Sequence, residues 1–404
     1  MMFLTGSLFF ATLSNHSGIT IPLALFFAFC FLAYLKFRFD NFYLPSFVWF
    51  YISAVFVVVE GLLFQIGIPE YKSAPEFNEA FLNNFIKYFI LIFLLYVYAV
   101  AIRNSPSSFL KSCFLVLIFH IVVFYIQFIF AYFLGYYIDF VLPFTGEASR
   151  FRFYGLASIS SLYRCTGLFV EPSTYAASIY CLILIIKFNP KYNGGLDKYL
   201  KLAFLSIALT LSTLSILILL LHLFFANLHK FLKIKSLLSI LVFLVVSIAL
   251  IPQTEIYQVQ SEKASSTSSI RFNLIDFVLN RDESLLVFGS GLFGIEKTLI
   301  SGSEAACGAV GECTSVVNRQ LASPADNGIL FYLFIKFGVA SFLILLFVFY
   351  PLFLSRKLDR IGYVFVLLLT KLQFAFPLIW IFILVMRGGN ENSSDNALVK
   401  KRWG

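Results

Sequence analysis

Arginines and carboxylates gather in a short stretch just ahead of an apolar run. In "RCTGLFVEPSTYA", Arg164 and Glu171 precede the run that follows Pro172, and Arg150 and Arg152 lie shortly upstream. Guanidinium groups bind phosphate oxygens in a bidentate manner, and a carboxylate within reach of a hydroxyl can accept its proton. These residue types predict a site for a phosphate-bearing ligand. Each arginine taken singly fits a lipid headgroup contact or an ion pair equally well.

A second set of charged residues lies far downstream. Arg271 opens "RFNLIDFVLNRDES", in which Arg281 belongs to a polar turn and is expected to be a solvated surface residue. Asp326 in "ADNG" stands before an apolar run, so it could cap a helix or act as a base, and the cap is the simpler interpretation. Glu171 could likewise act as a base or form a salt bridge with Arg164.

The composition indicates what must position these residues. Of the 404 residues, 60% are apolar and 13% are charged, and the mean hydropathy is +0.89, which excludes a soluble globular chain. Several apolar runs have the length of about 17–25 residues that a helix needs to cross a bilayer. Because lipid forces each backbone polar group to be satisfied within its own segment, we expect an all-α polytopic integral membrane protein.

The clearest spans are expected at residues 19–35, 43–66, 84–102, 112–134, 173–188, 236–251 and 327–353. Residues 200–228 and 361–386 could each form one span or a hairpin of two short helices. Lysines and arginines mark the cytoplasmic connections. Two hairpins, one turning near Leu211–Ser215 and the other near Lys371, keep these basic connections on the cytoplasmic side of the membrane. Residues 2–13 are expected to form an additional helix rather than a cleaved signal. The total is roughly ten to twelve helices.

The chain therefore divides into membrane and outer parts. The expected order is N-terminal helices 1–134, an outer loop 135–172, central helices 173–251, a large outer loop 252–326, C-terminal helices 327–386 and a cytoplasmic tail 387–404. The large loop contains Cys307 and Cys313 in "CGAVGEC". A close pair in an oxidising compartment predicts a disulfide, with two free thiols as the alternative.

Other motifs in the sequence give little information about function. "GSGLFG" at 289–294 has dinucleotide-fingerprint spacing but no surrounding βαβ pattern, so we interpret it as a turn. The four histidines all lie outside the large loop and no metal-ligand spacing occurs, so we expect neither a metal nor another cofactor. The net charge of +9 fits retained cytoplasmic loops rather than nucleic-acid binding.

Two stretches carry a family resemblance. "RCTGLFVEPSTYA" resembles the arginine, glycine and Glu-Pro-Ser pattern before a central helix of bacterial O-antigen and capsular polysaccharide polymerases. "SSIRFNLIDFVLNRDESLLVFGSGLFG" with "ASPADNGILFYLFIKFGVASFLILLFVFY" looks like the loop and following helix of the O-antigen polymerase and ligase superfamily. Family members often carry Ser-Arg-Gly in the hairpin near "LSTLS", and that arginine is absent here. The resemblance covers residues 150–353.

The resemblance implies a GT-C-like, lipid-sugar type of glycosyltransferase with one large periplasmic loop, in the bacterial inner membrane. It would polymerise undecaprenyl-diphosphate-linked oligosaccharide repeat units, in contact with membrane lipids and a chain-length regulator protein. Glu171 or Asp326 would be the base. The diphosphate would be bound by Arg150, Arg152, Arg164 and Arg271.

Two alternatives stay open. A ligase that transfers finished glycan to lipid A core uses the same donor, but ligases of the superfamily carry a histidine where this chain has Asp326. A flippase or other transporter would be expected to show repeat-related halves and charges within the membrane spans, and we find no internal repeat.

Overall fold

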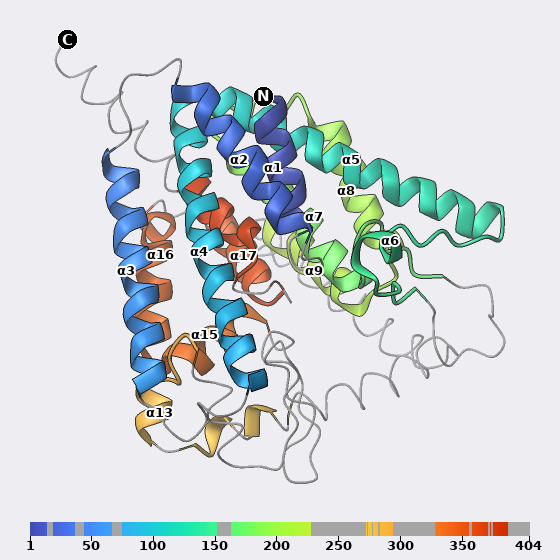
Figure 1. The fold of residues 1–404 in the computed structure, drawn as a ribbon. Coiled ribbons are helices and arrows are strands. Elements are labelled where there is room, and N and C mark those ends of the chain that lie inside the picture. The colour runs from blue at the N-terminus through green and yellow to red at the C-terminus, as the bar shows by residue number, and fades with distance from the viewer. Residues whose placement is uncertain are drawn as a thin grey trace.

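The computed structural model describes residues 1–13, 19–36, 44–66, 75–151, 163–227, 272, 274–276, 278–281, 283–293, 328–354, 358–370, 372 and 375–386. Within these residues the chain is a bundle of helices, which agrees with the predicted all-α class (Figure 1). The expected span 236–251 lies outside the described residues.

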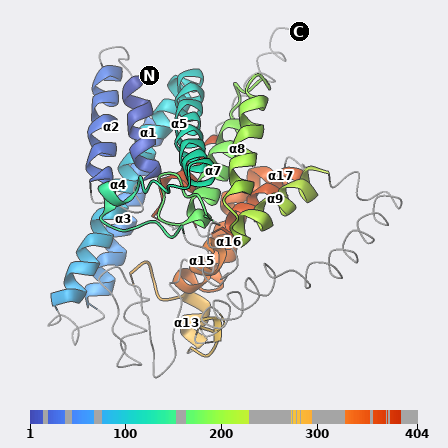
Figure 2. The ribbon, with the colours of Figure 1, turned by 90° about the vertical axis from the view of Figure 1, so that its right-hand side faces the viewer.

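The N-terminal helices form one side of the bundle. α1 (Met2–Thr12) and α2 (Thr20–Lys36) lie side by side, so residues 2–13 do form the additional helix (Figure 2). Their interface is joined by a buried polar contact, because Ser7 Oγ donates to the Ala24 carbonyl at 3.0 Å and lies 3.0 Å from the Tyr98 hydroxyl. Phe10 and Phe27 stack beside it.

Three long helices follow: α3 (Leu44–Ile66), α4 (Pro75–Asn104) and α5 (Pro106–Phe133). Pro106 stands in the first turn of α5, where its missing N–H removes no helical hydrogen bond. In the described part of the chain, two helical segments, Phe81–Asn104 and Pro106–Phe133, are long and apolar enough to cross a membrane.

The helix α7 (Pro172–Phe188) is the centre of the fold. Every residue from Thr174 to Ile186 is buried. It contacts α5, α8 (Asp197–Leu209), α9 (Thr213–Ala226) and α17 (Leu358–Leu368). A short helix, α6 (Leu142–Thr145), lies in the connection between α5 and α7.

Both segments that were expected to be hairpins are interrupted helices. α8 and α9 are separated by Leu211, whose φ of 52° is left-handed and breaks the helix, and Thr210 Oγ1 donates to Ser215 Oγ across the turn at 2.8 Å. The second segment consists of α17 and a helix at Pro377–Met386. Lys371, the expected turn residue, lies outside the described residues.

The segment 327–353, expected as one span, is not one continuous helix. The structure divides it into α15 (Ile329–Phe337) and α16 (Ala340–Leu354), with Gly338 between them. The backbone of α13 (Glu283–Phe288) approaches so closely that a Cβ on Gly338 would lie 2.4 Å from the Leu286 carbonyl oxygen, and Gly338 has a φ of 55°. Val339 N–H donates to that carbonyl at 3.1 Å. The break therefore exists because a distant segment docks at the end of α15.

Candidate functional site

The connection between α5 and α7 folds into a compact cap, defined here as residues 135–151 and 163–171. Asp139 organises its first turn, because its carboxylate accepts hydrogen bonds from the backbone N–H groups of Val141, Leu142 and Ser149 at 2.9, 3.2 and 2.7 Å. A short acidic side chain that bonds its own downstream backbone stabilises turns of this kind. The carboxylate of Asp139 is thus used for local structure.

Backbone pairing within the cap brings two of the candidate arginines together. Arg150 N–H donates to the Val170 carbonyl at 2.7 Å, and Arg164 N–H donates to the Phe151 carbonyl at 2.8 Å. The Arg164 guanidinium crosses this pairing, since Nη2 donates to the Arg150 carbonyl at 3.1 Å. Two arginines separated by thirteen residues in sequence therefore lie on neighbouring backbone segments that hydrogen-bond to each other.

Glu171 joins this pair of arginines at the start of α7. It is the N-cap residue, but its side chain makes no capping hydrogen bond. One carboxylate oxygen, Oε1, pairs with Arg150 Nη1, and the other, Oε2, accepts a hydrogen bond from Ser173 Oγ at 3.0 Å. The structure thus brings Arg150, Arg164 and Glu171 together, and it identifies Arg150 as an ion-pair partner of Glu171.

The exposure of these groups leaves the site accessible. The Arg150 side chain is 61% exposed, whereas that of Glu171 is 22% exposed. Arg150 also lies 3.7 Å from Glu147, which is itself 56% exposed. Exposed ion pairs contribute little to stability, about 0–1 kcal/mol. The Arg150 guanidinium is therefore within reach of a bound anion, and its contact with the exposed Glu147 costs little to give up.

Two further ionisable groups of the cap, Tyr137 and Cys165, are kept neutral by burial. Burial raises the pKa of Tyr137 well above its ordinary value and raises the pKa of Cys165 to about 12. The Tyr137 hydroxyl lies 3.1 Å from Ser149 Oγ and 3.2 Å from Thr166 Oγ1, and its ring stacks on Phe151 at 3.9 Å. These residues build the cap, and neither ionises near neutral pH. Among the described candidates, Glu171 is the carboxylate placed beside the arginines.

A buried glutamine anchors the cap to α5. Gln127 is fully buried; its Nε2 donates to the Ile138 carbonyl at 2.9 Å, and its Oε1 accepts from Thr166 and Gly167 N–H at 2.8 and 2.9 Å. Sequence reasoning missed this residue. The available signal was a lone amide within the long apolar run of α5, where an unpaired polar group would be costly.

Replacing Gln127 by leucine is expected to loosen the cap. The change leaves two N–H groups and one carbonyl without their partner, at about 1–3 kcal/mol for each buried group. We expect a lower melting temperature and faster proteolysis within residues 135–171 in the purified protein. Tyr136→Phe, which alters a 65% exposed ring, is the control. Unchanged melting and proteolysis in Gln127→Leu would show that these hydrogen bonds do not hold the cap.

Several predicted residues lie outside the described part of the chain. They are Arg152, Arg271, Asp326, Cys307 and Cys313. Their roles at the diphosphate, as a base and in a disulfide stay predictions.

Arg281 is not the solvated surface residue that its polar sequence neighbours suggested. It is buried, with 9% of its surface exposed. Its Nε donates to the Val278 carbonyl at 3.2 Å and its Nη1 donates to Ser290 Oγ at 2.7 Å. The reason is the turn at 289–293, which folds back onto α15 through Ser290 N–H and the Ile335 carbonyl at 3.1 Å. "GSGLF" is thus part of a turn, as its sequence context indicated.

Among the described residues, no group of three or more His, Cys, Asp or Glu side chains could hold a metal ion. Comparisons with protein-family models, with curated proteins and with solved structures find no match to this chain.

Proposed function

We propose that this chain is a multi-pass glycosyltransferase of the bacterial inner membrane that polymerises undecaprenyl-diphosphate-linked oligosaccharide repeat units into O-antigen or capsular polysaccharide. The observation that carries the proposal is the meeting of Arg150, Arg164 and Glu171 at the N-terminal end of the buried helix α7. Phosphate-binding groups and a carboxylate base are the two requirements of a transfer from a lipid diphosphate.

The surface of α5 supports the membrane location. One face exposes large apolar side chains at helical spacing, namely Leu115, Phe119, Val122, Ile126, Ile129 and Phe133. Three polar residues further along the same helix, Ser112, His120 and Gln127, are buried, and Ser112 lies 3.0 Å from Thr5 while His120 lies 2.8 Å from Thr12. A helix with its apolar face outward and its polar residues paired inside is suited to lipid rather than water.

In the proposed reaction the acceptor is a sugar hydroxyl of one lipid-linked repeat unit. Its oxygen attacks the anomeric carbon of the donor glycan and forms the new glycosidic bond, while the bond from that carbon to the phosphate oxygen breaks. The hydroxyl proton passes to the Glu171 carboxylate. Undecaprenyl diphosphate leaves with the electron pair of the broken bond, and Arg150 and Arg164 stabilise the charge that develops on it.

Arg150 would couple donor binding to the base. In the structure its guanidinium occupies Oε1 of Glu171, the oxygen that an acceptor hydroxyl would need. A diphosphate carries more negative charge than a carboxylate and offers bidentate acceptors, so it competes well for an exposed guanidinium. Transfer of Arg150 to the donor would free Oε1 only when the donor is bound.

The N-terminal end of α7 favours the same charge distribution. Backbone N–H groups in the first helical turn are directed outward, and the helix dipole places partial positive charge there. An anion bound beside Glu171 and Ser173 would therefore meet the helix end as well as the two arginines.

A ligase is the second candidate, because it uses the same donor and leaving group. A flippase would need no base. The test is the surface glycan of a strain that lacks this chain. We expect single repeat units on lipid A core, with the ladder of longer chains missing. A strain with no repeat unit on the core would instead support the ligase or the flippase and contradict the polymerase.

A further inference from the structure

The short helix α13 ends in two large apolar side chains on the surface of the protein. Val287 is 46% exposed and Phe288 is 74% exposed. The exposed residues of its first turn, Glu283 and Ser284, are polar instead. The helix is therefore polar at its start and apolar at its end. Exposed apolar groups that gather in this way mark a surface that contacts a membrane or another protein.

The backbone of the α15–α16 junction fixes the apolar end of α13 in place. Val339 N–H donates to the Leu286 carbonyl at 3.1 Å. A Cβ on Gly338 would lie 2.5 Å from the Val287 carbonyl oxygen, so the two backbones touch at this point. Val339 is itself 53% exposed. Val287, Phe288 and Val339 thus form one apolar surface, called here the apolar tip.

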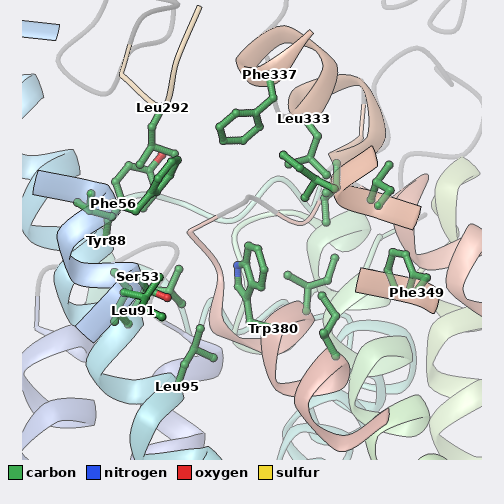
Figure 3. A pocket seen from close by; sticks show the side chains of 18 of the residues that line it. Ser53, Phe56, Tyr88, Leu91, Leu95, Leu292, Leu333, Phe337, Phe349 and Trp380 are labelled. Carbon is green, nitrogen blue, oxygen red and sulfur yellow. The ribbon is translucent and has the colours of Figure 1, made fainter. Parts of the chain in front are cut away.

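The turn that follows α13 anchors the tip from the inner side. Leu292 and Phe293 are both buried, and the Phe293 ring packs against Tyr88 of α4 with the ring centres 5.5 Å apart. Leu292 lines an apolar cavity of about 410 Å³ between α3, α4, α15 and α16. Figure 3 shows Leu292 and Phe337 on the same side of that cavity. Because the turn is held inside the bundle, the tip stays on its outside.

α13 is flanked by two helices whose outer faces are apolar. α16 exposes Phe342 and Leu343, and α3 exposes Leu63 close to its end. The turn after α13 approaches α3 at Glu60, since a Cβ on Gly291 would lie 2.9 Å from Glu60 Oε2. Figure 1 shows α13 beyond the same end of the bundle as the end of α3. The tip therefore continues the outer apolar surfaces of these two helices.

We propose that the apolar tip is inserted into the hydrocarbon of the bilayer, in the leaflet on the side that the sequence predicts for residues 252–326. α13 then lies at the membrane surface with its polar first turn in water. Apolar side chains gain free energy when they leave water, and interfacial helices attach to bilayers through such residues. The inference rests on the proposed membrane location and not on the proposed transfer reaction.

The continuity of the tip with α16 favours lipid over a protein partner. Val339 belongs to the tip and is followed on α16 by the exposed residues Phe342 and Leu343. A helix that exposes large apolar side chains along its length is suited to hydrocarbon. A surface that begins on such a helix and extends onto α13 meets the same solvent.

Insertion of the tip would hold the preceding segment at a fixed height. Leu274 and Val278 are buried at the spacing of one helix face, and Arg281 is bonded to Ser290 of the anchored turn. The described residues between 272 and 281 would therefore lie at the level of the lipid headgroups. The diphosphate of a membrane lipid lies at the same level, which is where the proposed reaction needs protein groups.

The test uses the purified full-length chain in nanodiscs that each contain one copy. Their phosphatidylcholine carries a photoactivatable diazirine on an acyl chain, and peptide mass spectrometry locates the residues that the lipid labels. We expect label on Phe288 and also on Phe342, the positive control on α16. Label on Phe342 without label on Phe288 would overturn the proposal. Absence of label from both residues would contradict the membrane location as well.

Paired variants test whether the tip itself carries the contact. In the double variant Val287→Ser with Phe288→Ser, label on residues 283–293 should fall about tenfold or more, because each apolar side chain favours hydrocarbon by about that factor. Label on Phe342 should stay the same. Glu283→Gln with Ser284→Ala, two exposed changes on the same helix, should alter nothing.

Nanodiscs with two copies of the chain test the other possible partner. Oxidation by hydroxyl radicals reports whether water reaches Phe288. We expect Phe288 to be equally protected with one copy and with two. Protection that appears only with two copies would make the tip an interface between copies and would overturn the proposal. Failure of the glycan experiment alone would leave it standing.

Discussion

Glu171→Gln is expected to stop formation of long glycan chains while the protein accumulates normally in the membrane. The amide keeps the size of the side chain and can still accept a hydrogen bond from Ser173, but it cannot take a proton from the acceptor hydroxyl. Loss of a general base typically lowers a rate by about 100- to 10,000-fold. The measurement is the glycan ladder of a strain that lacks the native chain and carries the variant, at matched protein levels.

Glu147→Gln is the matched control for this result. Glu147 contacts the same arginine as Glu171, at 3.7 Å, but its side chain is 56% exposed, against 22% for Glu171. Glu147→Gln changes the net charge by the same amount as Glu171→Gln. Because it leaves the proposed base in place, the glycan ladders should stay normal. A normal ladder from Glu171→Gln would exclude this carboxylate as the base. Asp326, the other predicted candidate, would then have to be tested by the same substitution.

The helices were the most predictable part of the fold. α2, α3 and α7 coincide closely with the expected runs because an apolar segment of that length has few alternatives to a helix, whereas α5 begins at Pro106 rather than at residue 112. α4 begins at Pro75, earlier than expected, because the polar residues before its apolar run continue the same helix. Charge parity indicated the interruption at Leu211, which periodicity alone did not resolve.

The errors arose where a distant segment decides the local structure. Gly338 looked like one small residue in a long apolar run, and only the approach of residues 286–287 requires a helix break there. Arg281 has polar neighbours in sequence, yet the turn at 289–293 covers it. Contacts of this kind join residues far apart in the chain, so neither composition nor periodicity contains them.

The residue types of the candidate site were predictable from the sequence, but which arginine pairs with which carboxylate was not. Phosphate chemistry singled out Arg150, Arg152, Arg164 and Arg271, and the need for a base singled out Glu171 and Asp326; of these, the described residues include Arg150, Arg164 and Glu171. Which arginine meets the carboxylate depends on the pairing of residues 150–151 with residues 164 and 170. The sequence offered Arg164 as a possible partner of Glu171, and the structure pairs that carboxylate with Arg150. Gln127 also holds that geometry, because its Oε1 accepts hydrogen bonds from the Thr166 and Gly167 N–H groups.

Arg164 and Arg271 are expected to act on one group, the donor diphosphate, and their substitutions should therefore fail together. Arg164→Ala and Arg271→Ala should each reduce chain formation by about 100- to 1,000-fold, as removal of a donor to developing charge commonly does. Lysine keeps the charge and loses the planar fork, so Arg164→Lys and Arg271→Lys should also be impaired, though less severely. The double alanine variant should be far less impaired than the product of the two single effects, because both groups serve the same transition state.

Arg164 also has a structural contact, its hydrogen bond to the Arg150 carbonyl, so the experiment must separate the two roles. The separating measurement is proteolysis of the cap in each purified variant. If glycan formation falls because the variant no longer binds phosphate, the cap should be as resistant to protease as in the unchanged protein. If it falls because the variant misfolds, the cap should be cleaved faster, as expected for Gln127→Leu. Normal glycan ladders from both alanine variants would show that these arginines serve only local or headgroup contacts. The diphosphate would then have to bind elsewhere, and Arg150, exposed beside Glu171, would be the first residue to substitute.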